Sequence, residues 1–84
     1  MFFVYILKSL KDKDLYIGYT SNLRKRLEEH NSGLTRSTKN RAPFRLAYYE
    51  AYTSQVEAKH RERNLKLHGR ARSQLFRRIK KSLE

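Results

Sequence analysis

Two runs near the start of the chain decide its fold: Phe2-Phe3-Val4-Tyr5-Ile6-Leu7, and Leu15-Tyr16-Ile17-Gly18-Tyr19 after a polar connection. Both runs are rich in β-branched and aromatic residues and lack helical spacing, which is typical of strands. The first run is apolar throughout, so it predicts a strand that is buried on both faces. We expect the runs to pair as an antiparallel hairpin about Ser9–Asp14, with Tyr5 opposite Tyr16.

The next segments predict a helix, a basic loop and a third strand. Candidate N-caps at 20–22 precede Leu23, Leu27 and His30, which recur at helical spacing until Gly33 ends the helix. Residues 34–43 carry basic side chains without an apolar period and predict a loop. The stretch 44–52 has strand propensity and should complete the sheet.

Two more helices close the chain. Ser54 and Glu57 form a capping-box pattern that opens a helix, which we expect to stop at Gly69. The last helix should place apolar residues inside and basic ones outside: Leu75, Phe76, Ile79 and Leu83 against Arg72, Arg77, Arg78, Lys80 and Lys81. The prediction is a single α+β domain over residues 1–84, with a small three-stranded antiparallel β-sheet packed with helices in the order β-β-α-β-α-α.

Charge and composition narrow the class of partner. The 84 residues carry 20 Lys and Arg against 8 Asp and Glu, a net charge of +12, which favours nucleic acid first and an anionic membrane surface second. No cysteine is present, which excludes a disulfide scaffold and a cysteine-bound zinc. The longest apolar run falls far short of the ~20 residues of a membrane span, so we expect a cytoplasmic protein.

A few polar residues lie at positions that make them candidates for a catalytic or metal-binding role. Glu62 lies between Ala58 and Leu65 on one helical face, which directs its carboxylate toward the sheet. It is either an ion-pair partner of an arginine such as Arg26, or a metal ligand or catalytic carboxylate. Arg26 and His30 share a face of the first helix, where a solvated basic face and a partner of the helix dipole are the plainer interpretations.

The ordered set of these residues resembles the GIY-YIG nuclease superfamily, and in particular its small stand-alone single-domain members. The likeness lies in Val4-Tyr5-Ile6, Tyr16 to Asn22, the first helix, Tyr48-Tyr49-Glu50, Ala58 to Lys66 and Gly69-Arg70-Ala71. The first triplet, Phe3-Val4-Tyr5, keeps only the tyrosine of the name-giving motif. The resemblance implies that Tyr5, Tyr16, Arg26, His30 and Glu62 are catalytic, with Glu62 as the one protein ligand of a single Mg²⁺ or Mn²⁺.

The chemistry of phosphodiester hydrolysis suits these residue types. Arg26 offers a planar fork of donors for the phosphoryl oxygens, and a divalent ion on Glu62 would neutralise charge and assist the leaving oxygen. Nearby cations should favour the phenolate form of a tyrosine base, and either Tyr5 or Tyr16 can fill that role. Gly18 either lets the substrate backbone approach the sheet or forms a bulge.

The prediction is an endonuclease with structure-selective or low sequence specificity, acting on DNA in preference to RNA, in repair or recombination. We expect a monomer with no membrane partner, and a second protein could supply specificity. The expected phosphate contacts are Arg36, Lys39, Arg41, Arg70 and Arg72. Two alternatives stay open: a non-catalytic nucleic-acid-binding module, and a catalytic subunit that is active only with a partner.

Overall fold

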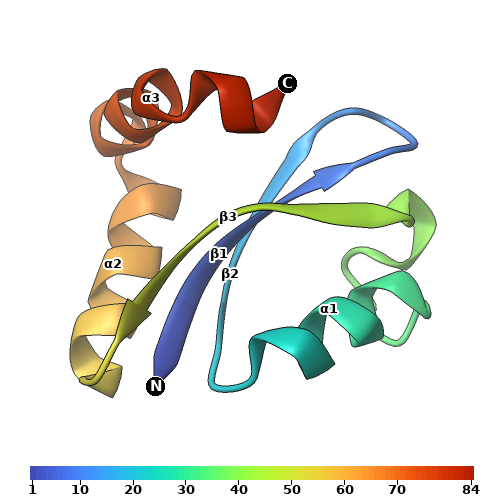
Figure 1. Ribbon diagram of the computed structural model, residues 1–84, viewed down its shortest axis with the longest axis horizontal. Coiled ribbons are helices and arrows are strands. Elements are labelled where there is room, and N and C mark those ends of the chain that lie inside the picture. Colours follow the sequence, from blue (N-terminus) through green and yellow to red (C-terminus); the bar gives the residue numbers. More distant parts are fainter.

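The computed structural model describes all 84 residues and confirms the predicted α+β order (Figure 1). The strands are β1 (Phe2–Ser9), β2 (Leu15–Thr20) and β3 (Phe44–Tyr52), and the helices are α1 (Leu23–Asn31), α2 (Gln55–Leu67) and α3 (Gly69–Arg78). Short 3₁₀ turns cover Lys39–Arg41 and Lys80–Leu83. None of the helices is long and apolar enough to cross a lipid bilayer.

The first strand is the centre of the molecule. The sheet order is β2-β1-β3, and both pairings are antiparallel. Because side chains alternate along a strand, Val4 and Ile6 pack with Ala58 and Leu65 of α2 on one face, whereas Tyr5 lies in a second cluster on the other. Helices α2 and α3 cover the first face and α1 covers the second (Figure 1), which confirms that β1 is buried on both sides.

The hairpin register differs from the expected one by two residues. Tyr5 lies opposite Gly18, and Tyr16 lies opposite Leu7. The turn decides this register, because the Ser9 hydroxyl accepts hydrogen bonds from the backbone of Lys11 and Asp12 and so centres the connection between those two residues. The expected pairing of Tyr5 with Tyr16 was wrong, but the two rings are still diagonal neighbours, with centroids 6.4 Å apart.

The junction of α2 and α3 also differs from the expectation. Helix α2 ends at Leu67, and Gly69 is the first residue of α3. Arg72, expected on the outside, is half-buried and donates to the carbonyls of Leu65 and Lys66. The last carbonyls of a helix have no intrahelical donor, so the guanidinium of Arg72 fills that need for α2.

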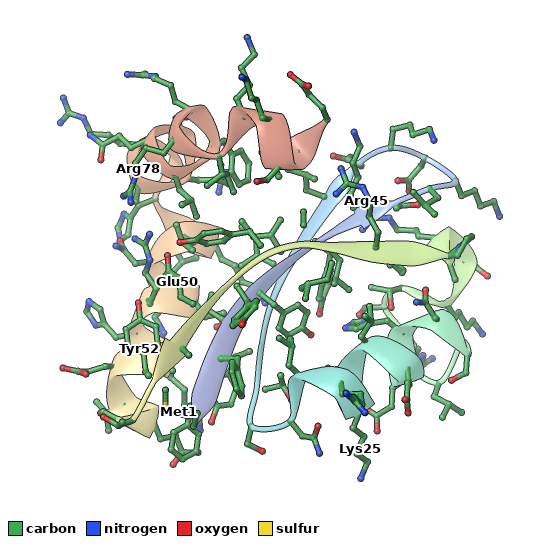
Figure 2. The ribbon with its side chains drawn as sticks, in the orientation of Figure 1. Met1, Lys25, Arg45, Glu50, Tyr52 and Arg78 are labelled. Carbon is green, nitrogen blue, oxygen red and sulfur yellow. The ribbon has the colours of Figure 1, made fainter.

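A polar cluster ties α2 to the outer strand β3. The Glu50 carboxylate accepts hydrogen bonds from the hydroxyls of Tyr48 and Tyr52 and a bidentate pair from Arg61 of α2. Figure 2 shows Glu50 and Tyr52 beside α2. Helix α2 carries Glu62, and this cluster fixes the position of that helix along the sheet.

Candidate active site

A cavity of about 290 Å³ opens at the edge of β2, between α1 and α2. Its lining comes from the strands and from both helices: Tyr5, Tyr16, Gly18, Tyr19, Arg26, Lys59, Glu62 and Arg63. Four of the five residues expected to be catalytic therefore meet here, although they are up to 57 positions apart in the sequence, from Tyr5 to Glu62. The fifth, His30, lies directly behind them.

His30 is joined to the cavity through Tyr5. The Tyr5 hydroxyl lies 2.9 Å from His30 Nε2, and His30 Nδ1 lies 2.7 Å from Thr38 Oγ1. His30 and Thr38 are fully buried, and the ring of Tyr16 packs edge-on against His30 at 5.0 Å. His30 is therefore a buried member of a hydrogen-bonded chain that reaches the cavity, and not an exposed partner of the helix dipole.

Burial sets the protonation states of Tyr5 and His30 in this hydrogen-bonded chain. Burial raises the pKa of the Tyr5 hydroxyl to about 12, and the nearby guanidinium of Arg26 only partly opposes the shift. The expectation that surrounding cations favour a phenolate was wrong for Tyr5. Burial also lowers the pKa of His30, and the charge of Arg26 adds to that effect. At neutral pH the pair is a phenol and a neutral imidazole, so one ring nitrogen of His30 is free to accept a proton.

Gly18 makes room for Tyr5. A Cβ atom on residue 18 would overlap the Cζ and hydroxyl oxygen of Tyr5, which lies directly opposite it. Pairing of β1 with β2 continues without interruption through Gly18, which excludes the bulge interpretation. The glycine lines the cavity as well, so approach of a substrate backbone at this point stays a prediction.

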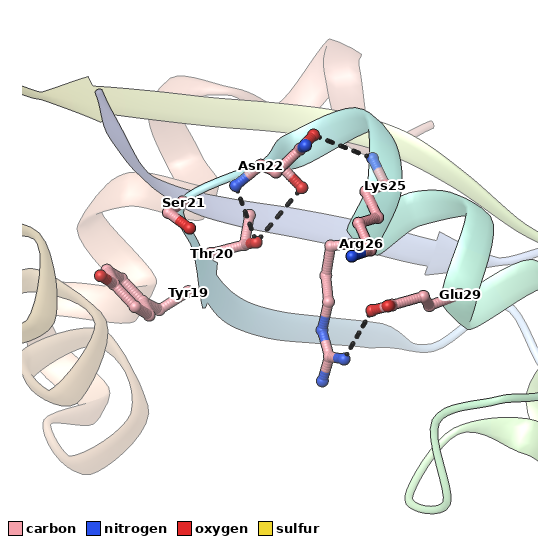
Figure 3. Close-up of a pocket in the computed structure, with 7 residues that line it drawn as sticks. All are labelled: Tyr19, Thr20, Ser21, Asn22, Lys25, Arg26 and Glu29. Carbon is pink, nitrogen blue, oxygen red and sulfur yellow. Dashed lines mark hydrogen bonds and ion pairs between the residues drawn. The ribbon is translucent and has the colours of Figure 1, made fainter.

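Arg26 reaches from α1 toward β2 (Figure 3), and it lines the cavity. Its guanidinium donates to Glu29 at 3.0 Å, one turn further along α1, and that bond is the main reason its pKa is raised. It forms no ion pair with Glu62. A guanidinium held by one edge keeps other N–H groups available for a bound anion.

Glu62 projects into the cavity from α2 with its side chain 22% exposed. Its ion-pair partner is Lys66, at 2.7 Å and one turn along α2, and not an arginine such as Arg26, which was one of the two interpretations of this residue. No group of three or more His, Cys, Asp or Glu residues could hold a metal ion. A site with one protein carboxylate suits Mg²⁺ or Mn²⁺, which keep several waters, and in this structure the carboxylate is paired with the ammonium of Lys66.

The residues expected to contact phosphate fall into two groups. Arg36, Lys39 and Arg70 are exposed, and they lie outside the cavity lining. Arg41 is engaged by Asp12 at 2.7 Å, and Arg72 is engaged by the end of α2. For all five, phosphate contact stays a prediction.

The structure adds functional candidates that the sequence reasoning missed. Lys59, Arg63 and Lys66 stand beside Glu62 on α2, where their spacing of three and four residues is a signal that was available in the sequence. Thr38 had no such signal, because its contact with His30 depends on how the loop folds back on α1.

Comparisons with known proteins agree with this geometry. A family model described as the GIY-YIG catalytic domain matches residues 1–76. A UPF0213 protein of Clostridium perfringens is 45% identical over 67 residues, 79% of this chain and 71% of that protein. A UPF0213 protein of Staphylococcus haemolyticus is 44% identical over 69 residues, 81% of this chain and 83% of that protein. The solution NMR structure of a UPF0213 protein from Bacillus halodurans is similar with a TM-score of 0.54 and 40% identity, over 89% of this chain and 82% of that one.

Proposed function

This chain belongs to the GIY-YIG family of nucleases, and from that premise we propose that it is a metal-dependent endonuclease that hydrolyses DNA phosphodiester bonds. One observation carries the proposal: Tyr5, Tyr16, Arg26 and Glu62 converge from four elements on a single cavity. We assign the enzyme to structure-selective or weakly sequence-specific cleavage, in repair or recombination. The proposed partner is DNA in preference to RNA.

Charge stabilisation falls to Arg26 and Glu62. Arg26 would donate its free N–H groups to the nonbridging oxygens, where negative charge builds up in the transition state. Glu62 would hold Mg²⁺ or Mn²⁺, which supplies Lewis-acid stabilisation of the phosphoryl and leaving oxygens when bound. Lys66 must leave Glu62 for this to happen, and its ammonium then remains close enough to pair with a phosphate.

Proton transfer is assigned to Tyr5 and His30. A water that attacks phosphorus must lose a proton as the P–O bond to the leaving group breaks. In the proposed step the Tyr5 oxygen takes that proton while its own proton passes to Nε2 of neutral His30, 2.9 Å away. Tyr5 therefore never carries a full negative charge, which fits its raised pKa. Tyr16 would orient the water or the phosphate.

The test is a cleavage assay in Mg²⁺ and in Mn²⁺ on branched, flap, single-stranded and duplex DNA. Glu62→Gln and Arg26→Lys should each lower kcat at least a hundredfold, because each removes a group that acts on the transition state. Glu28→Gln and Arg24→Lys change the same residue types at exposed positions of α1 and should cleave normally. An absence of cleavage with either metal, or cleavage that survives both active-site changes, would overturn the proposal.

A non-catalytic binding module is the second candidate, and the net charge of +12 favours it. Under that alternative, neither the wild type nor Glu62→Gln cleaves DNA, and metal has no effect on the protein. Under the nuclease proposal, Glu62→Gln keeps DNA binding and loses hydrolysis. Cleavage that appears only after a second protein is added would identify a partner-dependent enzyme.

A further inference from the structure

Two more hollows adjoin the catalytic cavity along the outer edge of β2. One, of about 540 Å³, lies where β2 passes into α1 and shares Tyr19 and Arg26 with the cavity (Figure 3). The other, of about 360 Å³, lies between the start of β2 and α3 and shares Tyr16. Because β2 is an edge strand, the three hollows follow one another along its open side. We call them the β2 groove.

The lining of the β2 groove carries more basic than acidic residues. Its lining has six basic and three acidic residues: Lys25, Arg26, Lys59, Arg63, Lys66 and Arg72, with Asp14, Glu29 and Glu62. Two of the acids are already neutralised, Glu29 by Arg26 and Glu62 by Lys66. Lys25, Lys59 and Arg63 have no acidic partner and are exposed, and Lys25 projects outward from α1 in Figure 2. A polyanion is the ligand that such a lining suits.

The length of the groove indicates how much of a strand it holds. The six residues of β2 extend about 17 Å at roughly 3.3 Å per residue. One strand of a nucleic acid advances about 3.4 Å per nucleotide, so β2 matches about five nucleotides. The catalytic cavity is the middle one of the three hollows, so nucleotides would lie on both sides of the bond that is cut.

We propose that the cleaved strand lies along the edge of β2 and occupies about five nucleotide positions, with phosphates near Lys25 on one side of the scissile bond and near Lys66 on the other. This assignment rests on the proposed nuclease function for the identity of the scissile bond. Binding along β2 can be measured without hydrolysis, so the two proposals can fail separately.

The binding test is an NMR titration of the protein, without added metal, with a five-nucleotide single-stranded DNA. Amide signals of residues 15–25 should shift at both ends of β2, and a dinucleotide should shift only part of that set. Lys25→Gln should weaken binding and lower the salt slope by about 0.7, the value for one phosphate contact on a single strand, whereas Lys80→Gln, which lies outside the groove, should not. Shifts confined to residues 77–81 of the basic C-terminal face would overturn the assignment.

The cleavage test uses end-labelled oligonucleotides of increasing length with Mg²⁺ or Mn²⁺. A groove filled on both sides of the scissile bond predicts internal cuts, with the terminal nucleotide released at least tenfold more slowly. Release of mononucleotides as fast as internal cutting would contradict the assignment. If the titration maps to β2 and no DNA is cut, the binding surface stands and the nuclease function falls.

A second inference comes from a buried hydroxyl. Thr38 Oγ1 lies 2.7 Å from His30 Nδ1, and Thr38 has no exposed surface. A neutral imidazole has one N–H, so the bond to Thr38 and the bond to Tyr5 must run in the same direction along the chain. The Arg26 guanidinium lines the same cavity as Tyr5, and its positive charge directs the Tyr5 hydroxyl proton away from itself, toward His30 Nε2. Nδ1 of His30 then carries the proton that faces Thr38.

We propose that Thr38 is a positioning residue that holds His30 in the Nδ1–H tautomer, so that the Nε2 lone pair faces Tyr5. The loop 34–43 thereby contributes to the active site from behind, through a hydroxyl that never meets the substrate. The sequence had predicted only its basic side chains as functional.

The test reads the His30 tautomer from ¹⁵N NMR of the ring in the wild type, in Thr38→Val and in Thr38→Ser. The wild type and Thr38→Ser should hold the Nδ1–H form, whereas Thr38→Val, which keeps the shape and removes the hydroxyl, should shift toward Nε2–H. Thr38→Val should lower kcat tenfold to a hundredfold with KM unchanged, and Thr38→Ser should restore it. An Nε2–H tautomer in the wild type, measurable without any variant, would overturn the proposal.

Discussion

At the scale of single residues, the contact between Gly18 and Tyr5 sets the site. The ring of Tyr5 lies over the α-carbon of the residue opposite it, and no other amino acid leaves that space free. Tyr5 in turn places its hydroxyl between the cavity and His30. The absence of a side chain at Gly18 therefore fixes the position and direction of the Tyr5 hydroxyl, which is the proposed proton acceptor.

Gly18→Ala should abolish most cleavage and destabilise the fold by about 1–3 kcal/mol, because the added methyl group displaces a buried ring. Gly33→Ala is the matched control. Its φ of +78° makes alanine cost about 1–2 kcal/mol there, and the new methyl group would make only an ordinary van der Waals contact with Lys39 Cβ, at 4.0 Å. Denaturant unfolding and a cleavage assay on both variants should show similar losses of stability and a loss of activity only for Gly18→Ala. Equal activities would show that Tyr5 does not need its present position.

His30 should make stability depend on pH below neutrality. Its pKa is lowered in the folded protein, so the unfolded chain binds the proton more readily. The contribution of neutral His30 to the free energy of unfolding is complete above pH 6.5, and it is lost as the pH falls below that value. The free energy of unfolding should therefore drop between pH 7.5 and pH 5.5 in the wild type and change less in His30→Gln. His60→Gln, at an exposed position, should retain the wild-type slope, and an unchanged slope in His30→Gln would contradict the assignment.

The sequence predicted which residues meet at the site better than how they meet. Tyr5, Tyr16, Arg26 and Glu62 were identified through the resemblance to the GIY-YIG family, and they do converge. The partner of Glu62 could not be identified, because Lys66 and Arg26 are both within reach of a carboxylate on that face until the distance between α1 and α2 is known. The register of the hairpin was missed for a related reason, since Ser9 decides it through side-chain bonds to the turn.

At the scale of elements, the position of α2 depends on β3, which is the edge strand opposite the β2 groove. Burial opposes ionisation of Glu50, but hydrogen bonds from Arg61 and two tyrosines outweigh it and keep its pKa low. Tyr48 and Tyr52 have their pKa values raised to about 12, mainly by burial. The cluster is a fixed set of donors around one carboxylate, which prevents α2 from sliding relative to β3.

Arg61→Met should cost about 1–3 kcal/mol of stability, because it leaves a charged, half-buried carboxylate with two neutral donors. Arg63→Met, on the exposed side of the same helix, should stay within about 0.5 kcal/mol of the wild type. Urea unfolding of both variants measures the difference. The double variant Glu50→Gln/Arg61→Met should recover part of the loss, and equal costs for Arg61→Met and Arg63→Met would show that the cluster adds nothing.

The sequence predicted which segments are helices and which are strands, and it predicted their ends less well. Strand β3 and helix α1 have nearly the predicted bounds, because aromatic residues mark the strand and an N-cap marks the start of the helix. The expectation that a helix stops at Gly69 was wrong, because a glycine that ends a helix and a glycine that begins one look alike in the sequence. The 3₁₀ turn at Lys39–Arg41 has no apolar period, and it forms where the loop packs behind His30.

At the scale of the whole molecule, the charge of +12 is spread over a protein with a radius of gyration of 12.3 Å. Like charges this close repel one another, which destabilises the folded state until salt screens them.

The melting temperature should therefore rise between 10 and 300 mM NaCl. A gain of about 1 kcal/mol corresponds to roughly 4–8 °C for a domain of this size. The Lys80→Gln/Lys81→Gln variant, at 12 − 2 = +10, should start higher and gain less from salt. Calorimetry at several salt concentrations provides the measurement, and a melting temperature that falls with salt would show that attractive pairs dominate.

The central position of β1 has a consequence for the order in which the protein is made. The strand that leaves the ribosome first must wait for the strand that ends at Tyr52, 52 − 9 = 43 residues after Ser9, before its second edge is covered. At 5–20 residues per second that interval lasts about 2–9 s. During this time the run from Phe2 to Leu7 has apolar side chains and an unpaired edge open to other chains. The segment that forms the core is thus the one that most needs a chaperone while the chain is being synthesised.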